Sequence, residues 1–281
     1  MPRVTAKVTD AAGNAASASA DYSVASQQSG MTIGARNSTI GWSNFEQKMG
    51  PVACTRFFHT DLPAQQTRTY SGITIPSRVV MWVSFRDGTT DANLRSYLAS
   101  MDPRTVLIFH HEPEGDYASG SDFVSKFDHF PNIVHNNSPG TWIVHAASGY
   151  NYGGSRPGTT GAYIPDSADA YTIDSYQGRV SASDMEPLEQ DDQFQKWLSL
   201  VGPKGKPIGI TEYGRGMEPS TATEDTKRIQ LMQADHAYLK SLPNVATWQY
   251  WWAAKNADDD WTFDDPAGQQ QWRDIATEHA G

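Results

Sequence analysis

Eight short apolar runs, each followed by a longer amphipathic or polar stretch, are the feature that most restricts how this 281-residue chain can fold. The runs are Thr32–Arg36, Cys54–His59, Arg78–Phe85, Thr105–His111, Thr141–Ala146, Ala170–Tyr176, Pro207–Tyr213 and Val245–Trp252. Strands that alternate with helical stretches are typical of a parallel sheet, and eight such units in roughly 250 residues form a closed barrel. We therefore predict an α/β fold, a (β/α)₈ TIM barrel over residues 30–281.

Helices are expected between these runs. The best candidates are Asp91–Met101, Ser121–Val134, Leu188–Leu200 and Thr223–Leu242. Several begin at a Ser, Thr or Asp, residues that cap helix N-termini. In the last segment apolar residues recur three or four positions apart, so that face should lie in the core. His236 lies on the same face, and we interpret it as a packed or edge histidine rather than a ligand.

Residues 1–29 follow a different pattern. Two alternating stretches, Val4–Thr9 and Ala18–Val24, flank a turn-like Asp10–Asn14, which predicts a β-hairpin. The string V-T-D-A-A-G-N resembles the last two strands of the immunoglobulin-like repeats of bacterial surface and phage proteins. We expect the end of such a module, followed by a linker at Ser26–Gly30, and hence a catalytic module of a larger multidomain protein.

Composition excludes several classes of function. A formal charge of -10 and a pI near 5.2 argue against a nucleic-acid partner, which requires clustered Lys and Arg. The chain has neither an apolar stretch of about 18 residues nor a basic N-terminus followed by an apolar run, so we expect no membrane span and no signal peptide. Cys54 is the single cysteine, and it begins its run at the end away from the expected active face.

Two glutamates stand at the ends of apolar runs, where a (β/α)₈ barrel carries its catalytic groups. Glu112 follows the fourth run and Glu212 ends the seventh, and these strand ends face each other across a closed barrel. Apolar walls should raise the pKa of Glu112, as a general acid requires. Two carboxylates about 5 to 5.5 Å apart would cleave a glycosidic bond by double displacement, whereas about 6.5 to 9.5 Å would imply inversion.

The strings around both glutamates resemble the catalytic motifs of the clan A glycoside hydrolases. H-E-P at residues 111–113 is similar to the acid/base motif, and I-T-E-Y-G at residues 210–214 is similar to the nucleophile motif. A histidine before the acid/base glutamate is typical of glycoside hydrolase family 26. The resemblance is therefore closest to that family, which includes β-mannanases and related β-glycanases.

This resemblance implies a retaining glycoside hydrolase that cuts β-glycosidic bonds within a polysaccharide, without a cofactor or metal. Glu112 would protonate the leaving oxygen and then activate water, and Glu212 would attack the anomeric carbon. Tyr176 would keep Glu212 ionised through a hydrogen bond. The substrate contacts would be His111, Tyr176, Trp251, Trp252, Trp82, His59 and Arg36. Either Trp251 or Trp252 would lie under the sugar, and an open cleft lined with tryptophan would favour internal cuts.

Two other functions remain open. One is a metal-dependent hydrolase, because His and acidic residues crowd together after the fourth run. The cluster comprises His110, His111, Glu112, Glu114 and Asp116, with His59 and His145 as further candidates. The other is a catalytically silent carbohydrate-binding barrel of a surface or phage tail protein, which need not keep two opposed glutamates. Glu114, Asp116 and Asp174 are rival carboxylates, and Glu114 is the first to replace if Glu112 proves inert.

The remaining expectations concern loops and surroundings. Tyr150, Tyr152–Gly154 and Asp258–Trp261 are expected to line the cleft, with the aspartates simply solvated. The partner should be a polysaccharide or oligosaccharide, and we expect a monomer that binds neither nucleic acid nor membrane. A polymeric substrate places the protein outside the cell, either free or associated with a cell surface or virion.

Overall fold

The computed structural model describes residues 31–36, 40–177, 181–216, 220–253, 261–262 and 264–280, together with the backbone of residues 3–9 and 15–21. Within these ranges no helix combines the length and the apolar character needed to cross a membrane.

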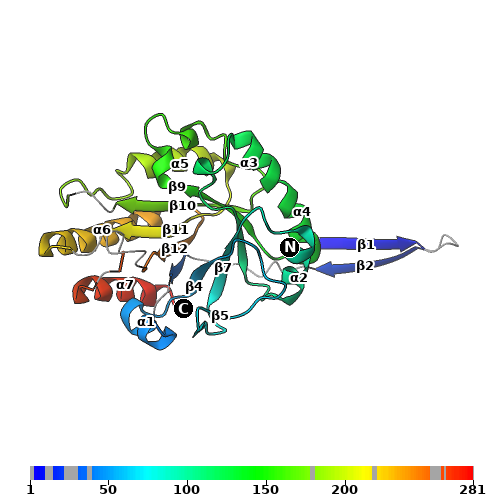
Figure 1. Ribbon diagram of the computed structural model, residues 1–281, viewed down its shortest axis with the longest axis horizontal. Coiled ribbons are helices and arrows are strands. Elements are labelled where there is room, and N and C mark those ends of the chain that lie inside the picture. Colours follow the sequence, from blue (N-terminus) through cyan, green and yellow to red (C-terminus); the bar gives the residue numbers. More distant parts are fainter. Residues whose placement is uncertain are drawn as a thin grey trace.

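Eight parallel strands close into a barrel, as predicted (Figure 1). In chain order they are β3 (Thr32–Ala35), β4 (Cys54–Phe58), β7 (Val80–Phe85), β8 (Val106–Phe109), β9 (Ile143–Ser148), β10 (Ala170–Gln177), β11 (Ile208–Arg215) and β12 (Val245–Tyr250). Each strand pairs with the next along the chain, and β12 pairs with β3 to complete the ring. Every predicted apolar run overlaps one of these strands, and β9, β10 and β11 extend one or two residues beyond their runs, which confirms the (β/α)₈ barrel architecture.

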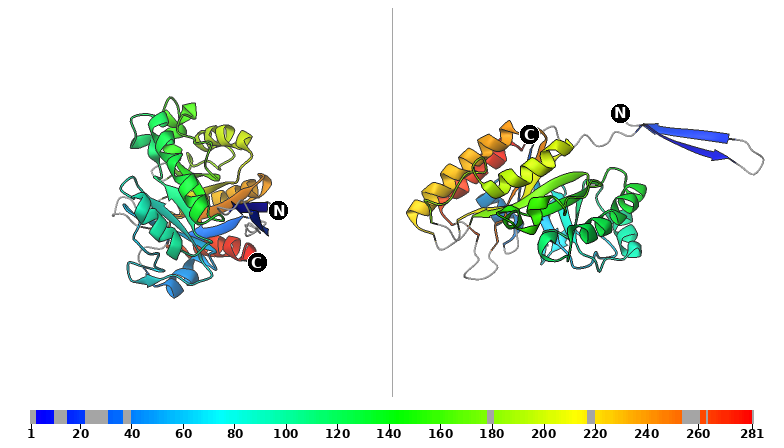
Figure 2. Two further views of the ribbon diagram at one scale, coloured as in Figure 1. Left: turned by 90° about the vertical axis from the view of Figure 1, so that its right-hand side faces the viewer. Right: turned by 90° about the horizontal axis from the view of Figure 1, so that it is seen from above.

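Helices lie around the outside of the strands in both views of Figure 2. They are α1 (Trp42–Met49), α2 (Asp91–Ser100), α3 (Gly120–Phe127), α4 (His129–Asn137), α5 (Asp192–Val201), α6 (Ala222–Ser241) and α7 (Pro266–Glu278). The single helix expected over 121–134 is in fact two, α3 and α4. Pro131 has no amide proton to donate to the preceding turn, so one continuous helix would lose a hydrogen bond there.

Two of the seven connections between successive barrel strands contain no α-helix, and the structure describes both of them completely. Between β4 and β7 the chain forms the hairpin β5 (Thr69–Tyr70) and β6 (Ile73–Thr74). Between β9 and β10 it forms the 3-10 turns η2 (Gly149–Tyr152) and η3 (Pro157–Thr160). Buried apolar residues of these connections join the main core in place of a helix; they are Leu62, Ile75, Val79, Tyr152, Tyr163 and Ile164.

Side-chain caps fix where most of the helices begin. The capping side chains, which accept hydrogen bonds from first-turn amides, are those of Thr90, Ser119, Asp191, Thr221 and Asp265. At α6, Thr221 and Glu224 form a reciprocal capping box. Ser, Thr and Asp therefore do mark helix starts, but at α2, α3, α5 and α6 the cap lies one to three residues from the first residue that the sequence led us to expect.

The inside of the barrel has an apolar lower part and a charged upper part. Side chains alternate along a strand, so every second residue faces inward. Near the N-terminal ends of the strands the buried interior cluster is Cys54, Trp82, Val106, Ile108, Val144, Ala146 and Ala170. Further along the strands, Arg56 and Asp174 form an ion pair, and Arg56 Nε lies 3.3 Å from Ser84 Oγ. The charged upper part is the floor of the candidate site.

A separate antiparallel hairpin precedes the barrel. Strands β1 (Arg3–Thr9) and β2 (Ala15–Asp21) pair with each other, with Thr9 opposite Ala15 (Figure 1, dark blue). The predicted hairpin is thus present, although its second strand begins earlier than expected. The expected turn at residues 10–14 and the linker at 26–30 lie outside the described residues. The assignment of this hairpin to an immunoglobulin-like module stays a prediction.

Candidate active site

A β-bulge places two consecutive residues of β11 inside the barrel. Ile210 pairs with Ile173, but Glu212 pairs with Asp174, so Thr211 is the extra residue. Thr211 Oγ1 donates a 2.7 Å hydrogen bond to Asp174, while Glu212 reaches other partners in the interior. Without the bulge, one of these two side chains would face the helices.

Arg56 joins two acidic residues across the barrel. Its Nη1 lies 2.9 Å from Asp174 Oδ1 and 2.8 Å from Glu212 Oε1, and all three residues are buried. β4 and β10, which carry Arg56 and Asp174, lie on opposite sides of the ring. One cation is therefore shared by two carboxylates in a region with little water. The sequence analysis missed Arg56, although a charged residue at an inward-facing position of an apolar run was a usable signal.

Glu212 is held by a cation and a phenol. The Tyr176 hydroxyl donates a hydrogen bond to Glu212 Oε2. The pKa of Glu212 is raised to about 6, chiefly by burial and also by the charge of Glu112, while Arg56 and Tyr176 act in the opposite direction. Burial raises the pKa of Tyr176 well above its usual value, so the phenol stays a donor. Trp261, with its ring centroid 4.6 Å from that of Tyr176, supports this tyrosine.

Glu112 occupies an unusual backbone conformation at the end of β8. Its φ of 54° is left-handed, and its amide donates a 2.8 Å hydrogen bond to the Ala146 carbonyl of β9. Left-handed conformations in residues other than glycine cost about 1 to 3 kcal/mol and occur most often at functional positions. Burial, together with the charge of Asp174, raises the pKa of Glu112 to about 7. Near neutral pH this carboxyl group can therefore both give and take a proton.

His110 fixes the loop that carries Glu112. Its Nδ1 lies 2.8 Å from Asp87 Oδ1, and its Nε2 lies 2.8 Å from Asp116 Oδ2. Arg86 Nη1 donates a 2.7 Å hydrogen bond to the same oxygen of Asp116. Asp116 is thus held in an ion pair at the edge of the loop. This arrangement suits a residue that positions the loop better than one that transfers a proton.

His111 turns toward the barrel mouth instead. Its ring packs edge-on against Phe58, with 5.0 Å between the ring centroids. Burial, with the charge of Arg56 next in importance, lowers the pKa of His111 to about 2, so the imidazole is neutral. Its Nδ1 is buried without a hydrogen-bond partner among the described residues.

The histidine and acidic residues near strand β8 do not converge on one point. Among the described residues, the group with three ligand atoms within 4.8 Å of one another is His236, Glu278 and His279, on α6 and at the end of α7. His145 is fully buried, and its ring contacts Phe123 in α3 instead of facing the mouth. The described residues therefore give no support to the alternative of a metal-dependent hydrolase centred on His110 to Asp116.

The tryptophans divide between the site and the core. Trp251 is partly exposed, and the Arg36 guanidinium carbon lies 4.2 Å from the centre of its indole. Trp252 is only 4% exposed and packs against Phe45 of α1, because the next residue along the chain faces the opposite way. Trp82 is 3% exposed and belongs to the apolar interior below Arg56. The expectation that Trp82 and Trp252 line an open cleft was wrong.

Arg36 and His59 lie at the rim of the same mouth. Burial lowers the pKa of Arg36, while the nearby charge of Glu212 raises it. His59 is partly buried, and its ring centroid is 6.0 Å from that of Tyr70 in the β5–β6 hairpin. The Tyr70 hydroxyl donates a 3.3 Å hydrogen bond to the Phe58 carbonyl, which ties the hairpin to the rim.

The loop after β9 separates into exposed and buried parts. Tyr150 is 64% exposed, with the Arg156 guanidinium 3.4 Å from its ring centre, whereas Tyr152 is buried and does not line a cleft. Glu114 is buried, and its Oε2 accepts a 3.2 Å hydrogen bond from the Ser148 amide. Burial raises the pKa of Glu114 to about 8, so it is largely uncharged at neutral pH. The aspartates expected at 258–260 lie outside the described residues.

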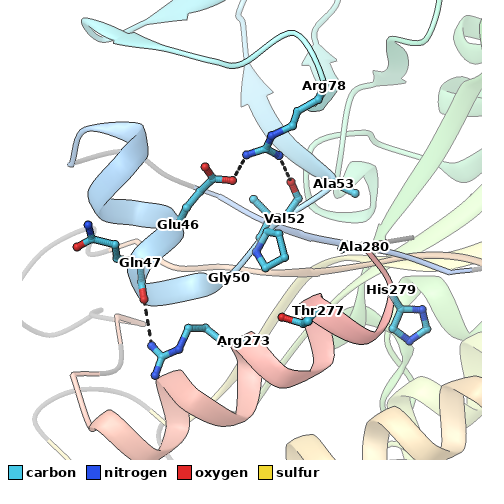
Figure 3. A pocket seen from close by; sticks show the side chains of 11 residues that line it. Glu46, Gln47, Gly50, Val52, Ala53, Arg78, Arg273, Thr277, His279 and Ala280 are labelled. Carbon is cyan, nitrogen blue, oxygen red and sulfur yellow. Dashed lines mark hydrogen bonds and ion pairs between the residues drawn. The ribbon is translucent and has the colours of Figure 1, made fainter.

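A pocket of about 800 Å³ opens at the other end of the barrel (Figure 3). It is lined by Val52 and Ala53, which precede β4, and by residues of α1 and α7. Arg78 Nη1 donates a 3.3 Å hydrogen bond to the Val52 carbonyl, and Arg273 donates to the carbonyl of Gln47. Because Glu112 and Glu212 lie at the C-terminal ends of the strands, this pocket is separate from the candidate active site.

No family model and no curated protein matches the chain. Several solved structures do. A family GH128 subgroup I endo-β-1,3-glucanase from Amycolatopsis mediterranei, in complex with laminaritriose, aligns with a TM-score of 0.57 and 18% identity over 88% of this chain and 100% of that one. A modular family 26 endo-β-1,4-mannanase from Cellulomonas fimi aligns with a TM-score of 0.58 and 17% identity over 89% of this chain and 71% of that one.

A curdlan-specific exo-β-1,3-glucanase of GH128 subgroup III from Blastomyces gilchristii aligns with a TM-score of 0.54 and 12% identity, covering 86% of this chain and 97% of that one. All three are glycoside hydrolases. At these identities the likeness establishes the barrel fold, and it extends to two families instead of singling out family 26.

Proposed function

We propose that this protein is a retaining glycoside hydrolase that cleaves β-glycosidic bonds within a polysaccharide. The observation that carries the proposal is the contrast between two glutamates at one barrel mouth. Glu212 is paired with Arg56 and Tyr176, whereas burial raises the pKa of Glu112 to about 7. Two carboxyl groups whose environments give them different proton affinities are what acid-assisted cleavage of a glycosidic bond requires, and the resemblance of the surrounding motifs to those of the clan A glycoside hydrolases favours double displacement. The similarity of the fold to β-glycan hydrolases supports the same class.

In this mechanism the protonated Glu112 gives its proton to the glycosidic oxygen while Glu212 attacks the anomeric carbon. The bond to the leaving sugar breaks as an ester to Glu212 forms. Glu112, now ionised, removes a proton from water, which attacks the anomeric carbon and releases Glu212. Arg56 and Tyr176 keep Glu212 anionic before it attacks. They also stabilise the Glu212 carboxylate when it departs as the leaving group in the second step.

The mouth offers contacts suited to a sugar. We assign Trp251 as the platform under the pyranose ring, since C–H faces of sugars pack on indole. The unpaired Nδ1 of His111 and the guanidinium of Arg36 supply hydrogen-bonding groups beside it. His59 would contact a sugar further along the rim. A polymeric substrate also implies that the protein acts outside the cell.

The similar structures are named for β-1,3-glucan and β-1,4-mannan hydrolysis, so we propose a β-linked glucan or mannan as the substrate. The test is hydrolysis of β-1,3-glucan, β-mannan, mixed-linkage glucan, xylan and bacterial cell-wall polysaccharide by the wild type and by Glu212→Ala. Sugar release that the variant loses would support the proposal, and proton NMR of the first anomer formed would report retention or inversion. Binding without release from any polymer would instead indicate a silent carbohydrate-binding barrel.

The pH profile gives a separate prediction. We expect kcat/KM to rise as Glu212 ionises, near its pKa of about 6, and to fall as Glu112 loses its proton, near its pKa of about 7. Tyr176→Phe removes a hydrogen bond that lowers the pKa of Glu212, so the acid limb should move up by about one pH unit while the basic limb stays. Tyr150→Phe, at an exposed tyrosine, is the control. An unmoved acid limb in Tyr176→Phe would contradict the assignment.

A further inference from the structure

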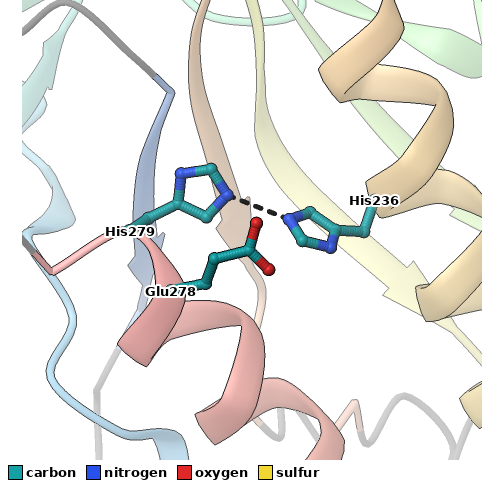
Figure 4. A group of neighbouring side chains, drawn as sticks. All are labelled: His236, Glu278 and His279. Carbon is teal, nitrogen blue, oxygen red and sulfur yellow. Dashed lines mark hydrogen bonds between the residues drawn. The ribbon is translucent and has the colours of Figure 1, made fainter.

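Two histidines and a glutamate meet where α6 lies beside the end of α7 (Figure 4). His236 comes from α6, Glu278 is the last residue of α7, and His279 is its C-cap. The Nε2 atoms of the two histidines are 2.9 Å apart, and one ligand atom from each of the three residues lies within 4.8 Å of the others. Nothing in the proposed glycosidase chemistry uses this cluster.

We propose that His236, His279 and Glu278 bind one divalent transition-metal ion, with Zn²⁺ as the best fit. Two imidazoles and one carboxylate are an established zinc donor set. Zinc–nitrogen bonds of about 2.0 to 2.1 Å at tetrahedral angles place two ligand nitrogens about 3.3 Å apart. The observed 2.9 Å therefore needs to widen by only a few tenths of an ångström to admit the ion.

The surroundings hold the donors in position. The His236 ring stacks on Trp248 of β12, with 6.1 Å between centroids and an interplanar angle of 20°. The His279 ring hydrogen-bonds the main chain of Met31, the outer contact that typically orients a metal-ligating histidine. Lys240 binds Oε1 of Glu278 and so fixes the carboxylate, while its positive charge opposes a cation. We therefore expect micromolar rather than nanomolar affinity.

A bound ion would join α6 to the end of α7 and would stabilise the fold without taking part in catalysis. His279 also lines the pocket at the N-terminal end of the barrel, so the ion would lie far from Glu112 and Glu212. The sequence interpretation of His236 as a packed histidine agrees with its contact to Trp248, but a packed ring whose Nε2 faces a second histidine can also be a ligand.

The experiment uses the full chain without an affinity tag, stripped of metal by chelator. Titration calorimetry with ZnCl₂ should give one ion per chain, and Co²⁺ should give the visible absorption of a tetrahedral site. Zinc at a hundredfold excess over Kd should raise Tm by about 5 to 10 °C. His279→Ala, at the end of a helix, should weaken zinc binding at least tenfold and abolish the rise in Tm.

His129→Ala is the matched control, because His129 is an exposed histidine bonded to a single aspartate, Asp91. It should bind zinc like the wild type. Glu278→Gln, which keeps the size of the side chain, should give an intermediate affinity. Circular dichroism and Tm in chelator verify that each variant folds. Absence of stoichiometric zinc binding in the wild type, or equal binding by His279→Ala and His129→Ala, would overturn the proposal and leave a simple histidine–histidine hydrogen bond.

Discussion

Glu212→Ala is expected to lower kcat for polysaccharide hydrolysis by at least about a thousandfold, because loss of a nucleophile removes the covalent route altogether. The variant should fold, since removal of the Glu212 carboxylate leaves Arg56 paired with Asp174. Added azide should restore cleavage of an activated aryl glycoside, as a small anion can enter the space left by the carboxylate. The product would then be a glycosyl azide of inverted configuration, which proton NMR identifies.

Glu112→Ala provides the complementary result. It should lose activity on polymers but keep the first step on an aryl glycoside whose leaving group needs no proton. Glu114→Gln is the matched control two residues away, since Glu114 is buried and largely uncharged at neutral pH. It should keep most of the activity. If Glu114→Gln were inactive and Glu112→Ala active on polymers, the acid/base assignment would pass to Glu114.

Arg56→Ala should be the most destabilising single change in the barrel interior, at about 3 to 5 kcal/mol in the free energy of unfolding. The reason is that two buried carboxylates, Asp174 and Glu212, would lose their shared cation. Burial already raises the pKa of both, and without Arg56 both values would rise further. Acids with a raised pKa in the folded state favour folding at low pH and lose that contribution as pH rises through the folded pKa.

Denaturant unfolding at about pH 5 and about pH 7 measures both effects, with a smaller loss for Arg56→Ala at the lower pH. Arg56→Met combined with Asp174→Asn should cost less than Arg56→Ala alone, because it removes one charge of each sign from the interior. Arg95→Ala, on the exposed face of α2, should stay within about 0.5 kcal/mol of the wild type. An Arg56→Ala variant as stable as Arg95→Ala would refute the role of the network.

Strand positions and the two glutamates could be predicted from the sequence because both depend on local pattern. A run such as Val106–Phe109 is apolar on both faces, which is what a strand between a packed barrel interior and surrounding helices must be. The first polar residues after such a run lie at the barrel mouth by chain geometry alone. The starts of α2, α3, α5, α6 and α7 were equally local, since one capping side chain marks each.

Side-chain direction could not be predicted so well. It follows the two-residue alternation along a strand, and a β-bulge shifts that alternation by one residue. The bulge at Thr211 turns both Thr211 and Glu212 inward, and no residue type in the sequence of β11 predicts a bulge there. Trp251 and Trp252 differ by one position, yet one is at the mouth and the other packs on α1. Arg56 forms its ion pair with Asp174, which is distant in sequence and opposite in the ring, so the sequence could not predict this pairing.

The two helix-free connections have a practical consequence for protein engineering. Both leave the ends of their strands on the side of the barrel where the candidate active site lies, and neither is constrained by a helix that must repack. Doubling the length of a flexible loop costs only about 0.6 kcal/mol in closure entropy. Within segments 59–79 and 149–169, the exposed stretches 63–65 and 154–155 are therefore the natural positions for grafting longer loops, while the buried residues that fill the core and the ring of strands stay unchanged.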